Sequence, residues 1–140
     1  MTTHVNRQNS ATMRPADTAG TTLQTKIGRT YRFEASHFLP CVPDGHKCKN
    51  MHGHNYRIEV VIACETLDER GFVMDFAEVD AEVMPLIEQV DHRVLNDVEG
   101  LENPTAEIIA AWFLQRIERC QSARVYETDD CWAQVDHPRI

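Results

Sequence analysis

Two segments of this chain alternate between apolar and polar side chains with a period of two. In TYRFEASHF (residues 30–38), one face would carry Tyr31, Phe33, Ala35 and His37. In HGHNYRIEVVIA (residues 52–63), one face would carry His52, His54, Tyr56, Ile58, Val60 and Ile62. Such alternation is typical of a β-strand with one buried face. The pattern therefore predicts an antiparallel sheet that is covered on one side only.

Two shorter segments complete the predicted sheet, and a first helix follows one of them. GFVMDF (71–76) is predicted as a third strand and ARVYET (123–128) as a fourth. Asp75 and Glu78 form the capping-box pattern that starts a helix. Pro85 lies inside this helix and is expected to kink or shorten it. The apolar residues of the helix recur at helical spacing and are Phe76, Val79, Val83, Leu86 and Val90.

A second helix is predicted to open at NPTAE (103–107), with Asn103 as its N-cap and Pro104 at its first position. Its apolar stripe comprises Ile108, Ile109, Trp112, Phe113, Ile117 and Cys120. The order strand, strand, strand, helix, helix, strand is typical of the α+β class. We therefore expect the two helices to cover one face of the sheet.

Length and composition favour a single globular domain. A chain of 140 residues can bury one core, and 42% hydrophobic with 26% charged residues is ordinary for a folded protein. Residues 1–24 are rich in Thr, Ala and Asn without periodicity, and they are predicted to form a flexible N-terminal tail. Residues 25–140 are predicted to form the domain.

The charge and the apolar pattern argue against several classes of partner. A net charge of −8 argues against nonspecific binding to nucleic acid or to anionic membranes, which needs a basic surface. No apolar run approaches the roughly 20 residues that span a bilayer, and the N-terminus lacks the apolar run of a signal peptide. Five cysteines without CxxC spacing suit a reducing compartment better than a disulfide framework. We therefore expect a cytoplasmic protein.

Three histidines are placed to converge. His52 and His54 lie two residues apart on one predicted strand, so their side chains project in parallel. His37 ends the inward face of the preceding strand, and antiparallel pairing across the loop 39–51 would bring it beside them. One histidine alone would be explained as a polar residue at a strand end. Three imidazoles at the rim of an apolar face suit zinc with an open fourth position.

Cys48 lies in the loop that leads to His52, between Lys47 and Lys49. Nearby cations and a metal favour the thiolate, which is the reactive form of cysteine. The thiol could take part in catalysis, or it could be a fourth ligand that closes the metal site and makes it structural. The residues alone leave both roles open.

The segment FEASHFLPCVPDGHKCKNMHGHNY (33–56) resembles the 6-pyruvoyltetrahydropterin synthase and 6-carboxytetrahydropterin synthase family. The resemblance covers about residues 28–135 and continues through GFVMDFAEV, DHRVLND, LENPTAE and VYETDDCWA. It implies that His37, His52 and His54 bind zinc and that Cys48 is a catalytic base rather than a ligand.

The resemblance also implies a catalytic pair, Asp91 and His92, and a glutamate, Glu127, that anchors the pterin. Without the resemblance, VDHRVLND could simply form a polar turn after a helix. Glu127 shares a predicted strand face with Val125 and points inward, where an unpaired carboxylate would be costly. There it could accept two parallel N–H bonds from the pterin edge.

The implied substrate is 7,8-dihydroneopterin triphosphate. The CxxxHGH spacing from Cys48 to His54 resembles the bacterial branch of queuosine (7-deazaguanine) biosynthesis, which forms 6-carboxy-5,6,7,8-tetrahydropterin, acetaldehyde and triphosphate. The alternative is the 6-pyruvoyltetrahydropterin branch of biopterin synthesis, which carries a longer spacer. An alternative of another class is a zinc-binding module without catalysis, in which Cys48 closes the coordination sphere.

The fold implied by the resemblance is the T-fold, a four-stranded antiparallel sheet with two helices packed on one face. Such subunits form homo-oligomers, usually trimers stacked into hexamers, with pockets between subunits. Asp91 and His92 would then serve Cys48 of a neighbouring subunit. The expected cofactor is zinc, and the expected partner is a small pterin triphosphate.

Overall fold

The two alternating segments form the longest strands of the sheet. The structure, a computed structural model, describes residues 13–138. β1 (Thr25–His37) and β2 (His52–Cys64) are antiparallel neighbours along their whole length. Their register places Thr25 opposite Cys64 and His37 opposite His52. The loop between them therefore joins two adjacent strand ends.

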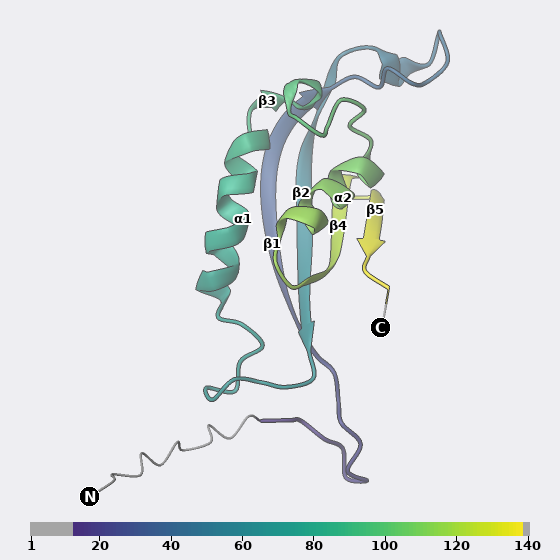
Figure 1. Cartoon of the computed structure of the whole chain (residues 1–140). Helices are drawn as coiled ribbons and strands as arrows, with labels where there is room; N and C mark the ends of the chain where they lie inside the picture. Colours follow the sequence, from purple (N-terminus) through teal and green to yellow (C-terminus); the bar gives the residue numbers. More distant parts are fainter. Residues whose placement is uncertain (1–12, 139–140) are drawn as a thin grey trace, which may run out of the picture.

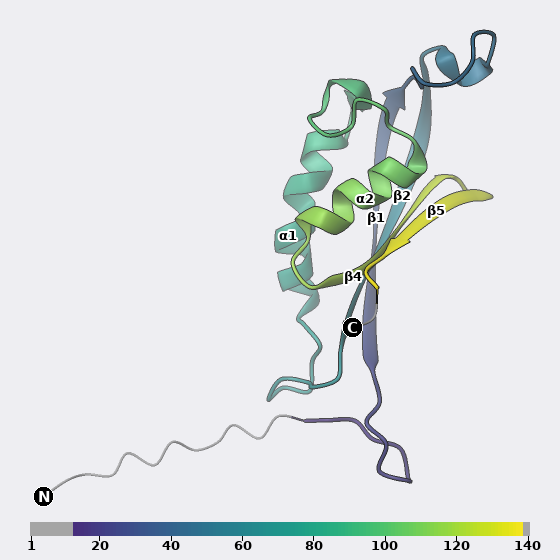
Figure 2. The same cartoon turned by 45° about the vertical axis from the view of Figure 1, so that its right-hand side comes forward.

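Three further strands give the sheet the order β3-β1-β2-β4-β5. β4 (Cys120–Thr128) pairs with β2, and β5 (Cys131–Asp136) pairs with β4, both antiparallel. β3 (Arg93–Val94) is a short parallel neighbour of β1. The helices α1 (Phe76–Val90) and α2 (Ala106–Arg116) lie on the same face of the sheet (Figures 1 and 2). The predicted α+β class is confirmed, with five strands in the described residues rather than the expected four.

The core lies between the sheet and the two helices. Phe33 of β1 stacks on Tyr56 of β2 with ring centroids 4.8 Å apart. The ring centroid of Phe113 of α2 lies 6.0 Å from that of Phe33. The inward apolar residues of both alternating segments are buried. Burial of one large apolar side chain contributes roughly 1.5–3 kcal/mol. A register slip of one residue would expose the whole set, so the alternation fixes the pairing of β1 with β2.

α1 begins with the predicted capping box. The Asp75 carboxylate accepts a hydrogen bond from the N–H of Ala77 (2.9 Å), and the Glu78 carboxylate accepts one from the N–H of Asp75 (3.3 Å). Of the two expected effects of Pro85, a kink or a shortening, the shortening does not occur, because α1 continues through it to Val90. Pro85 is exposed, so the carbonyl that lacks an N–H partner lies on the solvent side and can bond to water.

The prediction of a strand at 71–76 is also wrong. Asp68 Oδ1 accepts hydrogen bonds from two backbone N–H groups of a turn that ends at Phe72. The segment then runs directly into the N-cap Asp75. Its backbone therefore forms the approach to α1, and its buried residues Val73 and Met74 pack on the core from a loop.

No strand is predicted at 131–136, where β5 forms at the edge of the sheet. The residues of β5 are only part-buried or exposed, and Trp132 is 52% exposed. Ala133 and Val135 share a part-buried face, but the segment is only six residues long and Trp132 interrupts the alternation, so the pattern gives only a weak signal there. β3 has only two residues and is too short for any periodicity.

α2 is capped by Thr105 rather than by the predicted Asn103. The Thr105 hydroxyl accepts a hydrogen bond from the N–H of Ile108 (3.2 Å). Pro104 therefore precedes the helix and does not occupy its first position. Cys120, predicted on the apolar stripe of α2, is the first residue of β4. The predicted N-cap of α2 lies too early, and the predicted apolar stripe runs beyond the end of the helix. Such errors are usual at helix ends.

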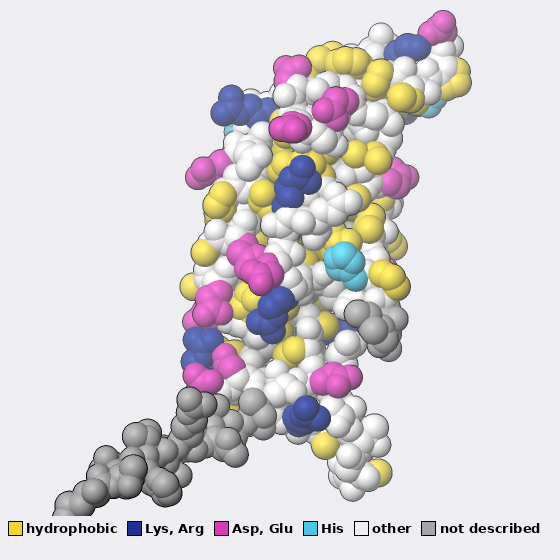
Figure 3. All heavy atoms as spheres, viewed as in Figure 1, with side chains coloured by type: hydrophobic (Ala, Val, Ile, Leu, Met, Phe, Trp, Pro, Cys, Tyr) yellow, Lys and Arg dark blue, Asp and Glu magenta, His cyan; other side chains and the backbone are white. Residues whose placement is uncertain are grey.

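The described part of the predicted tail, residues 13–24, includes contacts to the domain, and residues 1–12 lie outside the described residues. The Met13 carbonyl accepts a hydrogen bond from the N–H of Leu67 (2.6 Å). Acidic and basic side chains are interspersed over the surface in the view of Figure 3. In the described part of the chain, no helix is both long and apolar enough to cross a membrane.

Candidate active site

His37, His52 and His54 converge at one end of β1 and β2. His37 is the last residue of β1 and lies opposite His52, the first residue of β2. His54 follows two residues later on the same face. The three ring centroids lie 4.5, 5.1 and 5.0 Å apart, and the potential ligand atoms all lie within 4.8 Å of one another. Pairing across the loop therefore gathers the three imidazoles.

Two backbone carbonyls fix the tautomers of His37 and His52. Nδ1 of His37 lies 2.8 Å from the carbonyl oxygen of Pro104, and Nδ1 of His52 lies 2.7 Å from that of Asn50. A carbonyl oxygen only accepts, so each Nδ1 carries a hydrogen and each neutral ring has its lone pair on Nε2. These two Nε2 atoms lie 3.0 Å apart. The two lone pairs repel each other unless both bind one cation.

His54 completes the set of donors. Its Nε2 atom is buried and has no hydrogen-bond partner among the described residues. Burial lowers the pKa of both His37 and His54, so both rings favour the neutral form that binds metal. Three neutral imidazole nitrogens fit a divalent transition metal. The cluster is a candidate metal site.

Cys48 lies in η1 (Lys47–Lys49), a single 3-10 turn before β2. Its carbonyl accepts a hydrogen bond from the N–H of Leu39 (2.8 Å), which ties the turn to the chain just beyond β1. Within residues 13–138, the group of clustered ligand atoms consists of the three histidines and does not include the Cys48 thiol. The ammonium group of Lys49 forms an ion pair with Asp44 (2.6 Å).

Asp91 and His92 follow α1 at the edge of the sheet. Asp91 is the C-cap of α1, and its Oδ1 lies 2.9 Å from Nδ1 of His92. The N–H of Glu34 also donates to this oxygen (3.0 Å), and that hydrogen bond is the main reason that the pKa of Asp91 is lowered. Asp91 is thus a carboxylate placed to orient the imidazole of His92. The His92 side chain is largely exposed.

Glu127 lies near the end of β4, at a break in the pairing with β5 between Tyr126 and Thr128. Its Oε2 lies 3.9 Å from Nε2 of His54. The carboxylate is part-buried and faces the histidine cluster, as the predicted inward face requires. This geometry places a hydrogen-bond acceptor beside the candidate metal site.

Comparison with known proteins places the chain in a family. Residues 26–138 match the family described as 6-pyruvoyl tetrahydropterin synthase. The chain belongs to this family. A 6-carboxy-5,6,7,8-tetrahydropterin synthase of Synechocystis is 40% identical over 124 residues, which cover 81% of this chain and 95% of the relative. A putative enzyme of the same name from Archaeoglobus fulgidus is 35% identical over 114 residues, covering 78% and 93%.

Solved structures of the 6-pyruvoyl tetrahydropterin synthase family share the fold. The structure of Caenorhabditis elegans 6-pyruvoyl tetrahydropterin synthase gives a TM-score of 0.74 with 25% sequence identity. The match covers 83% of this chain and 97% of that one. The T-fold implied by the resemblance is therefore confirmed.

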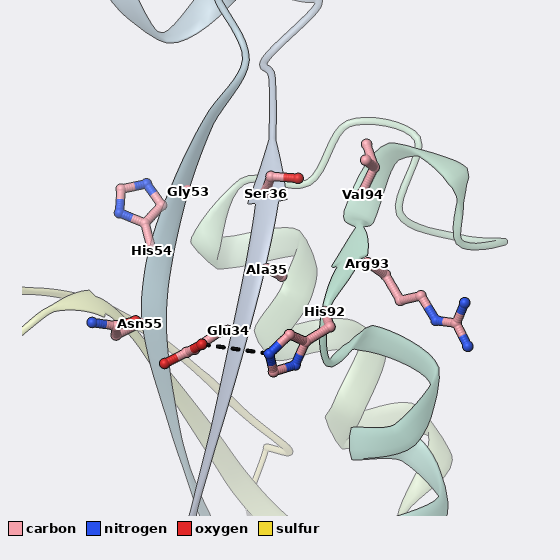
Figure 4. Close-up of a pocket in the computed structure, with 9 residues that line it drawn as sticks. All are labelled: Glu34, Ala35, Ser36, Gly53, His54, Asn55, His92, Arg93 and Val94. Atoms are coloured by element: carbon pink, nitrogen blue, oxygen red, sulfur yellow. Dashed lines mark ion pairs between the residues drawn. The ribbon is translucent and has the colours of Figure 1, made fainter.

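In this member of the 6-pyruvoyl tetrahydropterin synthase family, the expected site residues lie on two faces of the sheet. His37 shares the helix-covered face with Phe33. Glu34 projects from the opposite face, because neighbouring residues of a strand alternate. His92 lies beside Glu34, whereas the ring of His54 points away from them (Figure 4). One chain thus brings Glu127 within 3.9 Å of His54, whereas the Asp91–His92 pair lies across a hollow that both His54 and His92 line.

Two groups that contact the histidines are absent from the sequence-based prediction. The Tyr56 hydroxyl lies 3.2 Å from Nδ1 of His37. The alternating pattern of β2 could have identified Tyr56, because it puts this residue on the same face as His54. The Pro104 carbonyl comes from 67 residues away, just before α2. No residue pattern pairs it with His37, because the contact depends on how α2 packs on the sheet.

Proposed function

We propose that this protein is a zinc-dependent 6-carboxy-5,6,7,8-tetrahydropterin synthase of queuosine biosynthesis. It would convert 7,8-dihydroneopterin triphosphate to 6-carboxytetrahydropterin, acetaldehyde and triphosphate. The observation that carries the proposal is the convergence of His37, His52 and His54, with Cys48 four residues before His52. The 40% identity to the Synechocystis enzyme of that name supports this choice of reaction.

Zinc is the ion that we propose for the three imidazoles. Catalytic zinc is commonly held by three protein ligands, with a fourth position left for substrate or water. When bound, it would polarise the hydroxyl oxygens of the substrate side chain and stabilise negative charge that develops on them. The hydrogen bonds from His37 to Pro104 and from His52 to Asn50 fix which ring nitrogens face the ion.

Four other side chains would carry the remaining work. Cys48 is proposed as the general base that removes and returns protons at the side-chain carbons of the substrate. Asp91 holds His92 with Nδ1–H donating, which leaves Nε2 for proton transfer. Glu127 is proposed to accept two N–H bonds from the pterin edge. Its position beside His54 supports this role.

We also propose that the protein works as a homo-oligomer built from trimers, with a hexamer as two stacked trimers. In it, Asp91 and His92 would act with Cys48 of a neighbouring subunit. The exposure of His92 and its separation from the histidine cluster across the sheet support a shared site. A cytoplasmic location is proposed as well, supported by five cysteines that are all free thiols.

Formation of 6-pyruvoyltetrahydropterin is the second candidate function. The similarity in fold to the C. elegans 6-pyruvoyl enzyme, at 25% identity, favours it. The higher identity to the Synechocystis relative and the short spacing between Cys48 and His52 favour the 6-carboxy product.

The products decide between these reactions. The zinc-loaded protein would be incubated with 7,8-dihydroneopterin triphosphate and the products measured by mass spectrometry. The proposal expects 6-carboxytetrahydropterin with an equal amount of acetaldehyde. Accumulation of 6-pyruvoyltetrahydropterin without acetaldehyde would establish the second candidate. No turnover at full zinc occupancy would favour a zinc-binding module in which Cys48 closes the coordination sphere.

A further inference from the structure

Glu34 of β1 contacts both members of the Asp91–His92 pair through its backbone. Its N–H donates to Asp91 Oδ1 (3.0 Å), and its carbonyl accepts a hydrogen bond from the N–H of His92 (2.6 Å). These bonds hold His92 at φ 56°, a left-handed conformation that is uncommon for a residue with a side chain. Any residue except proline at position 34 would supply these backbone groups.

The side chain of Glu34 adds a contact that depends on its charge. Its Oε2 lies 3.6 Å from Nε2 of His92, while Asp91 Oδ1 lies 2.9 Å from Nδ1 of the same ring. Figure 4 shows the Glu34 and His92 side chains pointing toward each other. The imidazole therefore has one carboxylate at each of its two nitrogens.

Few other charged groups face this ring. Arg32, on the same face of β1, lines a neighbouring hollow together with His92. Arg93 of β3 follows His92 directly, but its guanidinium points away from the ring (Figure 4). On β2, the residue opposite Glu34 is the neutral Asn55. The carboxylates of Glu34 and Asp91 are thus the charged groups that contact the ring most directly.

The ring and the Glu34 carboxylate open onto a hollow of about 490 Å³. Ser36, Gly53, Asn55 and the candidate metal ligand His54 also line it. Figure 4 shows Glu34 and His92 side by side at this hollow. A reacting group brought to this edge of the sheet would therefore meet Nε2 of His92 next to a carboxylate.

We propose that Glu34 is a positioning residue for His92. Its carboxylate holds the ring with Nε2 at the hollow and stabilises the imidazolium that forms when both nitrogens carry a proton. His92 can then donate a proton as well as accept one. Asp91 contacts the other nitrogen, Nδ1, so the two carboxylates act on the ring together. The inference rests on the proposed function, in which Asp91 and His92 transfer protons.

The test compares Glu34→Gln with a matched control, Glu88→Gln. Both substitutions remove one negative charge close to the pair, but Glu88 lies on the exposed side of α1, three residues before Asp91. Gln at position 34 keeps the length of the side chain and the backbone bonds. Zinc content and melting temperature of both variants should equal those of the wild type, which shows that the fold is intact.

The first measurement is the NMR spectrum of the His92 ring nitrogens in the zinc-loaded, full-length protein. The His92 and Glu34 side chains are 73% and 64% exposed, so the effect should be that of one exposed ion pair. Glu34→Gln is expected to shift the Nε2 resonance, because a neutral amide replaces the carboxylate beside this nitrogen. Glu88→Gln is expected to leave the spectrum of the ring unchanged.

The second measurement is the dependence of kcat on pH. Glu34→Gln should move the alkaline limb of the profile to lower pH, with KM unchanged. Identical ring spectra in the wild type and Glu34→Gln would overturn the inference. So would equal spectral shifts in both variants, which would indicate only a long-range charge effect. A wild type without turnover would contradict the proposed function, while the ring spectra would still decide the role of Glu34.

Discussion

Gly53 lies against the backbone of Ala35 on the neighbouring strand, between the two metal-ligand candidates of β2. A Cβ atom at Gly53 would lie 3.3 Å from the carbonyl oxygen of Ala35. That oxygen belongs to the strand backbone and cannot rotate away as a flexible side chain would. The close approach of β1 and β2 at this point therefore favours a residue without a side chain.

The first prediction follows from this contact. Gly53→Ala should push β1 and β2 apart by a few tenths of an ångström next to His52 and His54 and weaken zinc binding about tenfold or more, the scale seen when metal ligands lose their support. Gly28→Ala is the matched control on β1, because its Cβ would lie 3.8 Å from the Val60 carbonyl. This control should gain roughly 0.5–1 kcal/mol of stability. Competition with a chromophoric chelator and urea unfolding measure the two effects. Equal zinc affinity in both variants would show that Gly53 is not required for close packing.

A second prediction concerns the proposed pterin anchor. Glu127→Gln replaces one acceptor by an N–H donor that would face the N–H groups of the pterin. Substrate binding should weaken by about 2–4 kcal/mol, because a charge-assisted pair is lost and a mismatch is introduced. Asp129→Asn, in the exposed turn after β4, is the control. Steady-state kinetics measure both, and an unchanged KM and kcat in Glu127→Gln would remove this residue from the site.

A third prediction concerns the attachment of α1 to the sheet. Asp80 Oδ1 accepts hydrogen bonds from Arg29 Nε (3.0 Å) and from the Tyr31 hydroxyl (2.6 Å). Both hydrogen bonds lower the pKa of Asp80, and the bond from Arg29 has the larger effect. A carboxylate with a lowered pKa in the folded state stabilises the fold above its ordinary pKa. It loses that contribution as the pH falls through the folded-state value.

Asp80→Asn should therefore be less stable than the wild type at neutral pH. The difference should begin to shrink below about pH 4, where the carboxyl group is protonated in the unfolded chain, and should disappear once the pH falls below the lowered folded-state pKa. Tyr31→Phe removes one of the two hydrogen bonds without changing the charge of Asp80 and should lose part of the same stability. Urea unfolding at neutral pH and again at acidic pH measures these differences in stability. A gap between wild type and Asp80→Asn that does not change with pH would contradict the assignment.

The parts of the site that the sequence predicts are those that depend on pairing between adjacent strands. Alternation in β1 and β2 sets which residues face inward, and a single loop sets the register. His37 therefore had to meet His52 once the strands paired. The α1 capping box is likewise a local pattern, in which Asp75 and Glu78 lie three residues apart.

The rest of the site depends on contacts that no local pattern encodes. The Glu34 contacts to Asp91 and His92 arise where the chain leaves α1 and runs parallel to β1 for two residues. The left-handed conformation of His92 is imposed by those contacts and not by its residue type. Asn103 and Thr105 are both good N-cap residues, so the start of α2 was decided by packing rather than by propensity.

The account rests on one distinction, that three histidines hold the metal and Cys48 does not. If this is correct, His52→Ala and His54→Ala should each largely empty the site, because two remaining imidazoles bind zinc poorly. Cys48→Ala should keep zinc near one per subunit and an intact fold. It should lose roughly 10²–10⁴-fold in turnover, the usual contribution of a positioned proton-transfer group.

Zinc content of the purified variants, measured by plasma emission spectroscopy beside their rates, tests this claim most directly. The account predicts a nearly full zinc content in Cys48→Ala and a nearly empty site in His52→Ala and His54→Ala. Loss of zinc from Cys48→Ala comparable to that of the histidine variants would contradict it. The thiol would then be a fourth ligand, and the metal site would be closed and structural.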